Sequence, residues 1–324
     1  MIAALYNGMV FFSATVFGRL GDTLSRRKVV MAGFFISGII FLLHNFVPDL
    51  KTLFIVRGLA GIGVGMIPGS LAALAWSGSV ALFTSFGSLG FAFASIIAGL
   101  LKQNFFVFTG AAFFCLVGFI FASRIKEKPV RLKVPFFPLA TVKKNIGIYL
   151  PYLIRHSAAS AIWAIFPIYL LGLGANRLAI GVIYGLNPVM QFIFMLMLDR
   201  YKKERLIDIG LIATSLTFLG YFLSPNWQII LIFQIVLGFS WANLYLGSMK
   251  CLLERNDEQA TATGLLNSVL GLSGIIGPLI GGIVVLLGTK VLFIFSTLLS
   301  LSALFVCRKC LTITDARSQV RPAG

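Results

Sequence analysis

The chain has 324 residues, of which 58% are hydrophobic and 11% charged, and its mean hydropathy is +0.96. This composition excludes an ordinary soluble domain, in which roughly 25% of residues are charged. The formal net charge of +17 would suggest nucleic acid as a partner of a soluble protein. The basic residues instead lie in short connectors between apolar runs, without aromatic stacking residues, so no nucleic-acid partner is expected.

Eleven apolar runs of membrane-spanning length follow one another along the chain. They cover residues 2–18, 29–47, 53–75, 80–101, 105–123, 146–172, 179–198, 206–223, 227–249, 260–287 and 290–307. Continuous apolar runs predict helices, whereas a barrel would show alternating segments of about ten residues. The sequence therefore predicts an all-α integral membrane protein with 11 transmembrane helices, surrounded by the lipid bilayer.

Alternate connectors differ sharply in their content of Lys and Arg. One set holds 21 basic residues, and the other set holds only Lys51, Lys102, Arg177 and Lys290. Basic residues accumulate in cytoplasmic connectors. We therefore expect a plasma-membrane protein that begins outside, with residues 311–324 as a cytoplasmic tail.

The sequence repeats with an offset of 177 residues. Asp22 matches Asp199, and Arg57-Gly58-Leu59-Ala60-Gly61 lines up with Gln234-Ile235-Val236-Leu237-Gly238. The same offset places the counterpart of span 146–172 upstream of Met1, so we expect five helices in one bundle and six in the other. The predicted bundles are 1–123 and 146–310, separated by the basic linker 124–145.

The connector 18–28 reads Gly-Arg-Leu-Gly-Asp-Thr-Leu-Ser-Arg-Arg-Lys. It resembles the signature between the second and third helices of major facilitator superfamily (MFS) transporters, with a glycine, an Asp four residues later and a basic cluster. The span number, the repeat and the long middle linker agree with this resemblance. It implies an MFS fold of two pseudo-symmetric helical bundles that give alternating access to a midplane site.

A cytoplasmic gate is predicted at two of the basic connectors. A carboxylate at the inner end of one helix is favoured by the N-terminal dipole of another helix. We expect Asp22 to contact the start of span 260–287 and Asp199 to contact the start of span 80–101. Local pairing of Asp22 with Arg26 is the alternative, and both arrangements are compatible. The predicted gate residues are Gly18, Asp22, Arg26, Arg27, Asp199 and Arg200.

Polar and charged residues within the spans are candidates for the substrate pathway, because an intramembrane charge is costly unless it faces a wet cavity or a partner. Arg57 lies in Leu53-x3-Arg57-x3-Gly61-x-Gly63, which is similar to a pattern of proton-coupled MFS antiporters, but Arg57 could also snorkel to the outer surface. Arg155 lies deep if its helix starts at Ile146 and near the inner rim if it starts near Leu150. The candidates are Arg57, Arg155, His156, Asn187, Gln191, Gln234 and Asn243; the uncharged ones could instead bond between helices.

Small residues recur on successive turns of span 260–287, which predicts close helix packing. The run is similar to the eleventh helix of the MFS. The predicted packing residues are Gly271, Gly274, Gly277, Pro278, Gly281 and Gly282. The fourth span, in contrast, lacks the Gly-Pro that marks drug and proton antiporters.

Deep inside the predicted spans there is no Asp or Glu to balance Arg57 and Arg155. We therefore predict a secondary transporter of a small-molecule substrate, with an anionic or amphipathic metabolite favoured and H+ as a candidate coupling ion. A drug/proton antiporter is the alternative within the family, and a non-transporting receptor or assembly subunit is the alternative of another class. No enzyme activity, cofactor or metal site is expected, and we expect a monomer.

Overall fold

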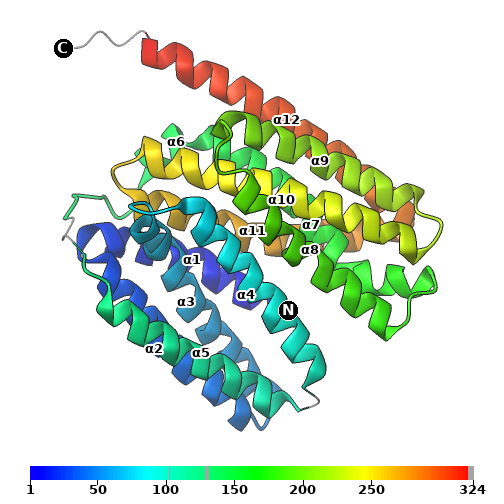
Figure 1. Cartoon of the computed structure of the whole chain (residues 1–324), viewed down its shortest axis with the longest axis horizontal. Coiled ribbons are helices and arrows are strands. Elements are labelled where there is room, and N and C mark those ends of the chain that lie inside the picture. Colours follow the sequence, from blue (N-terminus) through cyan, green and yellow to red (C-terminus); the bar gives the residue numbers. More distant parts are fainter. Residues whose placement is uncertain (102, 128–130, 320–324) are drawn as a thin grey trace. The chain divides into compact units, whose positions relative to one another are not determined.

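The computed structural model describes residues 1–101, 103–127 and 131–319, and this part of the chain is built from helices and their connectors (Figure 1). The helices are α1 (Ile2–Thr23), α2 (Arg26–Leu43), η1 (His44–Phe46), α3 (Leu50–Ala75), α4 (Val80–Leu100), α5 (Asn104–Arg124), α6 (Leu139–Lys144), α7 (Ile146–Gly172), α8 (Arg177–Met197), α9 (Lys203–Leu223), α10 (Trp227–Arg255), α11 (Gln259–Val284), η2 (Val285–Leu287) and α12 (Thr289–Gln319). Among the described residues, 10 helices are long and apolar enough to cross a membrane. The first predicted span forms α1, which is not among those 10. The predicted all-α membrane fold is confirmed.

Polar residues just ahead of the helices fix several of the boundaries. A side-chain oxygen accepts a backbone N–H three residues later at the start of α3, α4 and α8, at 2.8–3.1 Å, and the capping residues are Asp49, Ser79 and Asn176. Such caps satisfy helix N–H groups that lack a partner within the helix. The hydrogen bond from the Thr52 N–H lowers the pKa of Asp49 below its usual range. Because Asp49 caps α3, this helix begins at Leu50 rather than at the predicted residue 53.

The predicted connector 18–28 is wrong at both ends. Helix α1 continues through Thr23, and α2 begins at Arg26 because the Ser25 side chain accepts the Lys28 N–H at 3.2 Å. Asp22 and Arg26 therefore lie on helices, on either side of a two-residue turn. Helix α12 likewise continues past residue 310, where a tail was predicted, to Gln319, and residues 320–324 lie outside the described part.

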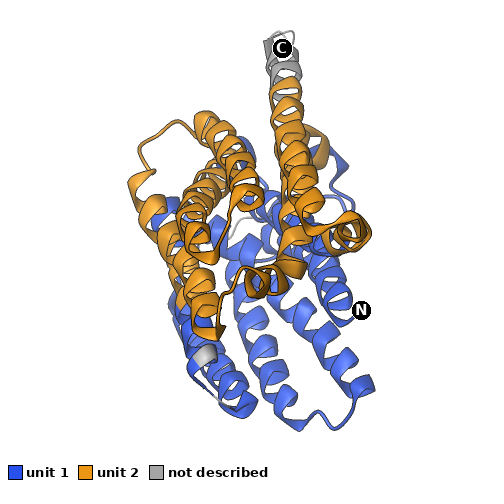
Figure 2. Cartoon of the chain, turned by 90° about the vertical axis from the view of Figure 1, so that its right-hand side faces the viewer, with its two compact units in different colours: residues 1–83, 93–141, 252–275 blue, residues 84–92, 142–251, 276–324 orange. Residues whose placement is uncertain are grey.

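The chain forms two compact units (Figure 2). Unit 1 contains residues 1–83, 93–141 and 252–275, and unit 2 contains residues 84–92, 142–251 and 276–324. The chain passes from unit 1 to unit 2 after residue 141, within the predicted linker 124–145. Each unit also contains a segment of the bundle predicted for the other, because residues 252–275 belong to unit 1 and residues 84–92 to unit 2. Within unit 1, α3 packs against α1 and α2, and α5 packs along α2 (Figure 1). Within unit 2, α12 packs against α7 and α9.

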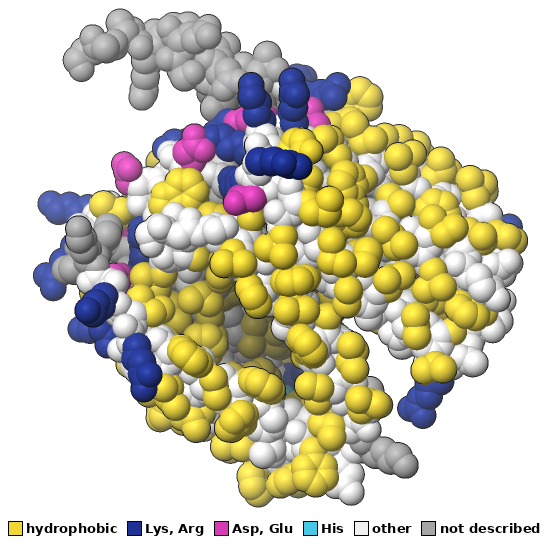
Figure 3. Space-filling model, viewed as in Figure 1, with side chains coloured by type: hydrophobic (Ala, Val, Ile, Leu, Met, Phe, Trp, Pro, Cys, Tyr) yellow, Lys and Arg dark blue, Asp and Glu magenta, His cyan; other side chains and the backbone are white. Residues whose placement is uncertain are grey.

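The surface carries many large hydrophobic side chains. Phe12, Phe121, Ile168 and Phe305 are all more than 60% exposed, and hydrophobic side chains dominate the face shown in Figure 3. Soluble monomers rarely expose contiguous apolar patches beyond a few hundred Å². This surface suits lipid acyl chains, as expected of a multi-pass membrane protein.

Close helix packing involves most of the glycines predicted for it. In unit 1, a Cβ added to Gly271 would lie 2.8 Å from the carbonyl oxygen of Asn7, and one on Gly274 would meet the Asn7 side chain. In unit 2, a Cβ on Gly277 would lie 2.5 Å from the carbonyl oxygen of Ser157, and one on Gly281 would lie 2.9 Å from the Cα of Ala161.

Gly282 is the exception to this packing. A Cβ on Gly282 would meet no described atom within 4 Å, so its predicted packing role is wrong. Gly282 follows Gly281 directly, and adjacent positions point to different sides of a helix. Pro278 lies inside α11, which continues past it to Val284.

A close contact in unit 1 brings α1 against α11. A Cβ on Gly18 would lie 2.6 Å from the carbonyl oxygen of Ala260, and one on Gly264 would lie 2.5 Å from that of Ala14. Both of these carbonyl oxygens belong to the backbone, which cannot move aside as a flexible side chain can. Glycine is therefore required at residues 18 and 264 for this approach of the two helices.

Replacing Gly18 by Ala is expected to destabilise the protein by about 1–3 kcal/mol, because an added methyl group forces α1 and α11 apart. The measurement is the midpoint of thermal unfolding in detergent, which should fall by several degrees. Gly8→Ala is the matched control on the same helix, since its Cβ would make an ordinary 3.6 Å contact with Ile275. Equal midpoints for the two variants would contradict the packing argument.

Candidate functional site

Asp22 lies at the last turn of α1 and is fully buried. Its carboxylate accepts the backbone N–H groups of Ala260 at 3.2 Å and Thr261 at 2.7 Å, and the Thr261 hydroxyl at 2.8 Å. These residues form the first turn of α11. The N-terminus of a helix favours a carboxylate through its free N–H groups and its dipole. The predicted contact between Asp22 and the start of this helix is present.

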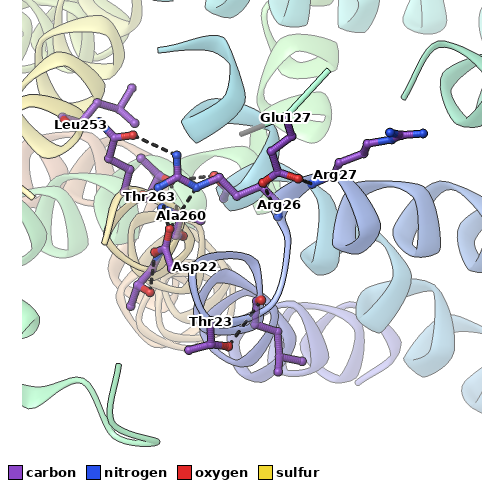
Figure 4. Close-up of polar contacts among 12 residues, drawn as sticks. Asp22, Thr23, Arg26, Arg27, Glu127, Leu253, Ala260 and Thr263 are labelled. Atoms are coloured by element: carbon purple, nitrogen blue, oxygen red, sulfur yellow. Dashed lines mark hydrogen bonds and ion pairs between the residues drawn. The ribbon is translucent and has the colours of Figure 1, made fainter. Parts of the chain in front are cut away.

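Arg26 adds the second predicted contact of Asp22. Its Nη2 lies 2.8 Å and its Nε 3.1 Å from Oδ1 of Asp22, and its Nη1 donates to the side chain of Gln259 at 3.2 Å. Gln259 in turn donates to the carbonyl oxygen of Leu253 at 2.7 Å. Figure 4 shows Arg26 reaching from the start of α2 toward Asp22 and the segment that leads into α11. The local pair and the contact with α11 therefore occur together.

Glu127 is a part of this site that the sequence analysis missed. Its carboxylate accepts the hydroxyl of Ser25 at 2.7 Å and the backbone N–H groups of Arg26 and Arg27 at 2.9 and 3.0 Å. It therefore caps α2 from a position about 100 residues away in the chain. Arg27 donates to the carbonyl oxygen of Ser123.

The linker lies along the same end of unit 1. The backbone N–H of Leu132 donates to the carbonyl oxygen of Asp22 at 2.9 Å, and Arg19 donates to that of Val134 at 2.9 Å. An open pocket of about 490 Å³ adjoins Arg26. It is lined by Arg26, Trp76, Leu132, Leu253, Glu254, Asn256, Asp257 and Gln259. No local sequence signal marked this pocket, because its lining comes from four separate stretches of chain.

Asp199 and Arg200, the predicted counterparts of this site, lie in the turn between α8 and α9 of unit 2. The Asp199 carboxylate is 2.6 Å from Nζ of Lys250 and about half exposed. The Arg200 guanidinium lies 5.7 Å from the ring of its neighbour Tyr201. Asp199 therefore has a surface ion pair where Asp22 has a buried set of hydrogen bonds. Its expected contact with the start of α4 stays a prediction.

Arg155 is the largest fully buried side chain of the described residues, with 1% of its surface exposed. Helix α7 begins at Ile146, so the deeper of its two predicted positions applies. Its Nε donates to the hydroxyl of Thr214 on α9 at 2.9 Å, and its guanidinium lies 5.3 Å from the ring of Trp241 on α10. Within the described part of the chain, no carboxylate pairs with it. A buried guanidinium held by a hydroxyl and a ring keeps its positive charge uncompensated.

Aromatic rings surround His156 beside this arginine. The Trp241 ring lies 5.3 Å from the imidazole and 5.9 Å from the Tyr152 ring, and it stacks on Tyr245 at 5.6 Å. The Tyr152 hydroxyl is buried and has no hydrogen-bond partner among the described residues. Arg155 and His156, predicted together, therefore form one cluster with these aromatic residues.

Asn187 and Gln191 also lie together, one turn apart on α8. The Gln191 amide donates to Asn187 at 2.9 Å and accepts the hydroxyl of Ser88 at 3.0 Å. Ser88 belongs to the segment of α4 that forms part of unit 2. The bond between Asn187 and Gln191 lies within α8, and the bond between Ser88 and Gln191 joins α4 to α8, as the alternative of interhelical bonding predicts for Gln191.

Gln234 and Asn243 lie on opposite sides of α10, because nine residues correspond to about half a turn beyond two full turns. Gln234 is fully buried, and both its amide atoms lack a hydrogen-bond partner in the part of the chain that the structure describes. It shares the side of Trp241, which is seven residues or about two turns further along the helix. Asn243 donates to the carbonyl oxygen of Phe239 at 2.8 Å. Gln234 is therefore the α10 amide on the same side of the helix as the Arg155 cluster.

Arg57 belongs to unit 1 and has different surroundings. It is half-buried, and its guanidinium lies 5.9 Å from the ring of Phe108 on α5. Because α3 begins at Leu50, Arg57 is seven residues, or about 10 Å, inside the helix. The residues around it belong to η1, α3 and α5.

The helices, the apolar surface and the buried polar clusters define a multi-pass membrane protein of the transporter class. A family model described as Major Facilitator Superfamily matches residues 148–323. The chain belongs to the major facilitator superfamily, whose members carry small molecules across membranes, so the predicted family and transporter class are confirmed.

Two known proteins show how far the likeness extends. The chain is 27% identical over 316 residues to the uncharacterized MFS-type transporter YuxJ of Bacillus subtilis (strain 168), covering 85% of this chain and 78% of that protein. Its fold resembles the crystal structure of the human organic anion transporter MFSD10 (TETRAN), with a TM-score of 0.80 and 15% identity over 94% of this chain and 82% of that one.

Proposed function

We propose that this chain is a secondary active transporter of an organic anion or anionic amphiphile that works by alternating access. The observation that carries the proposal is the buried guanidinium of Arg155, which is held by Thr214 and Trp241 without a carboxylate among the described residues. In a low-dielectric environment such a charge strongly stabilises a bound anion by Coulomb attraction, and it repels a cation. A solved structure of the same fold belongs to an organic anion transporter, but at 15% identity this likeness concerns the fold alone.

The surrounding groups suit an amphipathic anion. Trp241, Tyr152 and Tyr245 offer apolar ring surface next to the positive charge. Gln234 and the Tyr152 hydroxyl supply buried polar atoms that have no partner among the described residues. We assign the anionic group of the substrate to Arg155, and one hydrogen bond to Gln234.

Drug/proton antiport is the second candidate, favoured by the pattern around Arg57. A Cβ on Gly61 would lie 2.4 Å from the carbonyl oxygen of Tyr6, so this glycine of the pattern serves close packing of α3 on α1. Gly61 therefore has a packing role, and the antiport candidate depends on Arg57 itself. His156 is the group we propose for proton coupling, because an imidazole can titrate near neutral pH and an anion bound at the adjoining Arg155 would favour its protonated form.

We further propose that the protein is a plasma-membrane monomer whose C-terminus is cytoplasmic. The support is the distribution of basic residues, 21 in one set of connectors against four in the other. Asp22, Arg26 and Glu127 would then lie on the cytoplasmic side and act as its gate, a contact that forms when the inner side closes.

The test is transport into proteoliposomes that contain the purified protein. Radiolabelled aryl carboxylates and sulfonates are compared with the lipophilic cation tetraphenylphosphonium, with and without an imposed pH gradient. Protein-dependent movement of an anion is the expected result. Movement of the cation alone would support the antiporter, and absence of any movement across the panel would favour a non-transporting receptor or assembly subunit.

A further inference from the structure

A pocket of about 350 Å³ opens at the end of unit 1 that carries the α2–α3 connector. It is lined by His44, Asn45, Leu53, Arg57, Asn104, Phe105 and Phe108. These residues come from η1, α3 and the first two turns of α5. The transport site proposed above lies in unit 2, so this pocket is independent of it.

Two of the side chains that line this pocket carry polar atoms with no hydrogen-bond partner among the described residues. Nε2 of His44 is buried without a hydrogen bond, while its Nδ1 contacts the carbonyl oxygen of Ile40 at 2.9 Å, and the residue is 7% exposed. Asn45 donates to the Thr109 hydroxyl at 3.0 Å and leaves its own oxygen unpartnered. Arg57 contacts the Phe108 ring and pairs with no carboxylate among the described residues. The pocket therefore offers the positive charge of Arg57, which no carboxylate among the described residues balances.

The N-terminus of α5 adds to this positive character. Asn104 and Phe105, its first two residues, line the pocket. Gln103, which precedes them, makes no side-chain hydrogen bond to the helix, whereas α3 is capped by Asp49. Free N–H groups and the helix dipole favour a negative group at such an end.

An apolar groove of about 340 Å³ continues from the pocket along the seam between α2 and α5. Thr109 joins the two, because it lines the groove and accepts the hydrogen bond of Asn45. The other groove residues are Phe34, Phe35, Gly38, Ile39, Leu42, Ala112, Phe113, Leu116 and Phe119. From Leu42 to Phe34 the groove extends about 12 Å along α2. Figure 1 shows α2 and α5 side by side over this length.

We propose that this seam binds one anionic phospholipid, with its phosphate against Arg57 and the start of α5, and with an acyl chain along the groove. The charged pocket together with the adjoining apolar groove selects this ligand. A soluble anion would use the pocket and leave the groove empty, and a neutral lipid would use the groove and leave Arg57 without a counter-charge. Charge-assisted hydrogen bonds to phosphate are the strong contacts, so Arg57 contributes most of the headgroup affinity.

The first test is native mass spectrometry of the delipidated full chain in dodecyl maltoside, titrated with palmitoyl-oleoyl phosphatidylglycerol. One lipid should be retained in preference to the zwitterionic palmitoyl-oleoyl phosphatidylcholine, and Arg57→Gln should weaken retention of the anionic lipid by about tenfold. Lys51→Gln is the matched control, since Lys51 lies on the same helix and outside the pocket lining. Equal retention in the two variants, or equal retention of the two lipids, overturns the proposal.

The second test separates the lipid from a free anion by filling the groove. Ile39 is 46% exposed, so Ile39→Trp fills the groove without disturbing the core and should reduce lipid retention severalfold. Leu43→Trp, on the same helix and outside the groove lining, should leave it unchanged. Both proteins should keep the thermal midpoint of the parent when free of lipid. Unchanged retention in Ile39→Trp, or displacement of the lipid by millimolar inorganic phosphate, shows a simple anion site and overturns the proposal.

Discussion

Replacing Arg155 by Gln is expected to weaken uptake of an anionic substrate by about thirtyfold or more, which corresponds to at least ~2 kcal/mol for loss of one partner of a buried charge pair. The guanidinium is 1% exposed, so its charge is poorly screened by water. A neutral analogue of the same solute should be transported nearly as before. The measurement is the initial rate of uptake into proteoliposomes over a range of substrate concentrations.

Two further variants separate charge from shape at this position. Arg155→Lys keeps the charge and loses the planar group that lies over Trp241, so we expect an intermediate rate. Arg177→Gln removes an exposed arginine of unit 2 that has no proposed role, and it should leave uptake unchanged. Transport of lipophilic cations that tolerates Arg155→Gln would instead show that the pattern around Arg57 was the better guide to function.

Asp22→Asn is expected to slow turnover by about tenfold or more while the protein still inserts into the membrane. The change keeps size but removes the charge that Arg26 and the first turn of α11 share, and each charge-assisted hydrogen bond contributes about 1.5–3 kcal/mol. It also leaves Arg26, 8% exposed, without its ion-pair partner. Turnover is measured by uptake, and insertion by the yield of monodisperse protein in detergent.

The matched control is Asp199→Asn, at the equivalent position of the repeat. Its carboxylate is about half exposed beside Lys250, and such surface pairs contribute about 0–1 kcal/mol. We therefore expect less than a fivefold change. The double variant Asp22→Asn with Arg26→Gln removes both buried partners and should recover thermal stability relative to Asp22→Asn alone. Normal turnover in Asp22→Asn would exclude the proposed gate.

The spans and the Asp22 contact could be predicted from the sequence because each depends on a simple physical requirement. A bilayer demands apolar runs of fixed length, and a carboxylate at a helix end seeks the N-terminus of another helix. The boundary errors at residues 18–28 have an equally local reason. Charged side chains at the ends of a helix continue it past the apolar run, as Arg19 and Asp22 do in α1.

Contacts between distant parts of the chain could not be predicted in this way. In the sequence, Glu127 is a single acidic residue in a basic linker, and no neighbouring residue indicates that its carboxylate caps α2. The hydroxyl of Thr214 that holds Arg155 lies 59 residues further along the chain. Gly282 shows the opposite error, since its spacing resembles that of its neighbours but it faces away from them. Periodicity identifies a face of a helix, whereas partners depend on the packing of other helices.

The division of α11 between the two units has a mechanical consequence. The unit boundary falls between residues 275 and 276, within one turn of Pro278. Proline lacks the N–H that would bond to the carbonyl of Gly274, and that carbonyl instead accepts the side-chain amide of Asn7 at 3.3 Å. The backbone ladder of α11 already lacks one hydrogen bond at this point, so the helix bends more easily where its two halves belong to different units. Thermal motion of the half that packs on α7 is therefore only partly transmitted to the half that packs on α1.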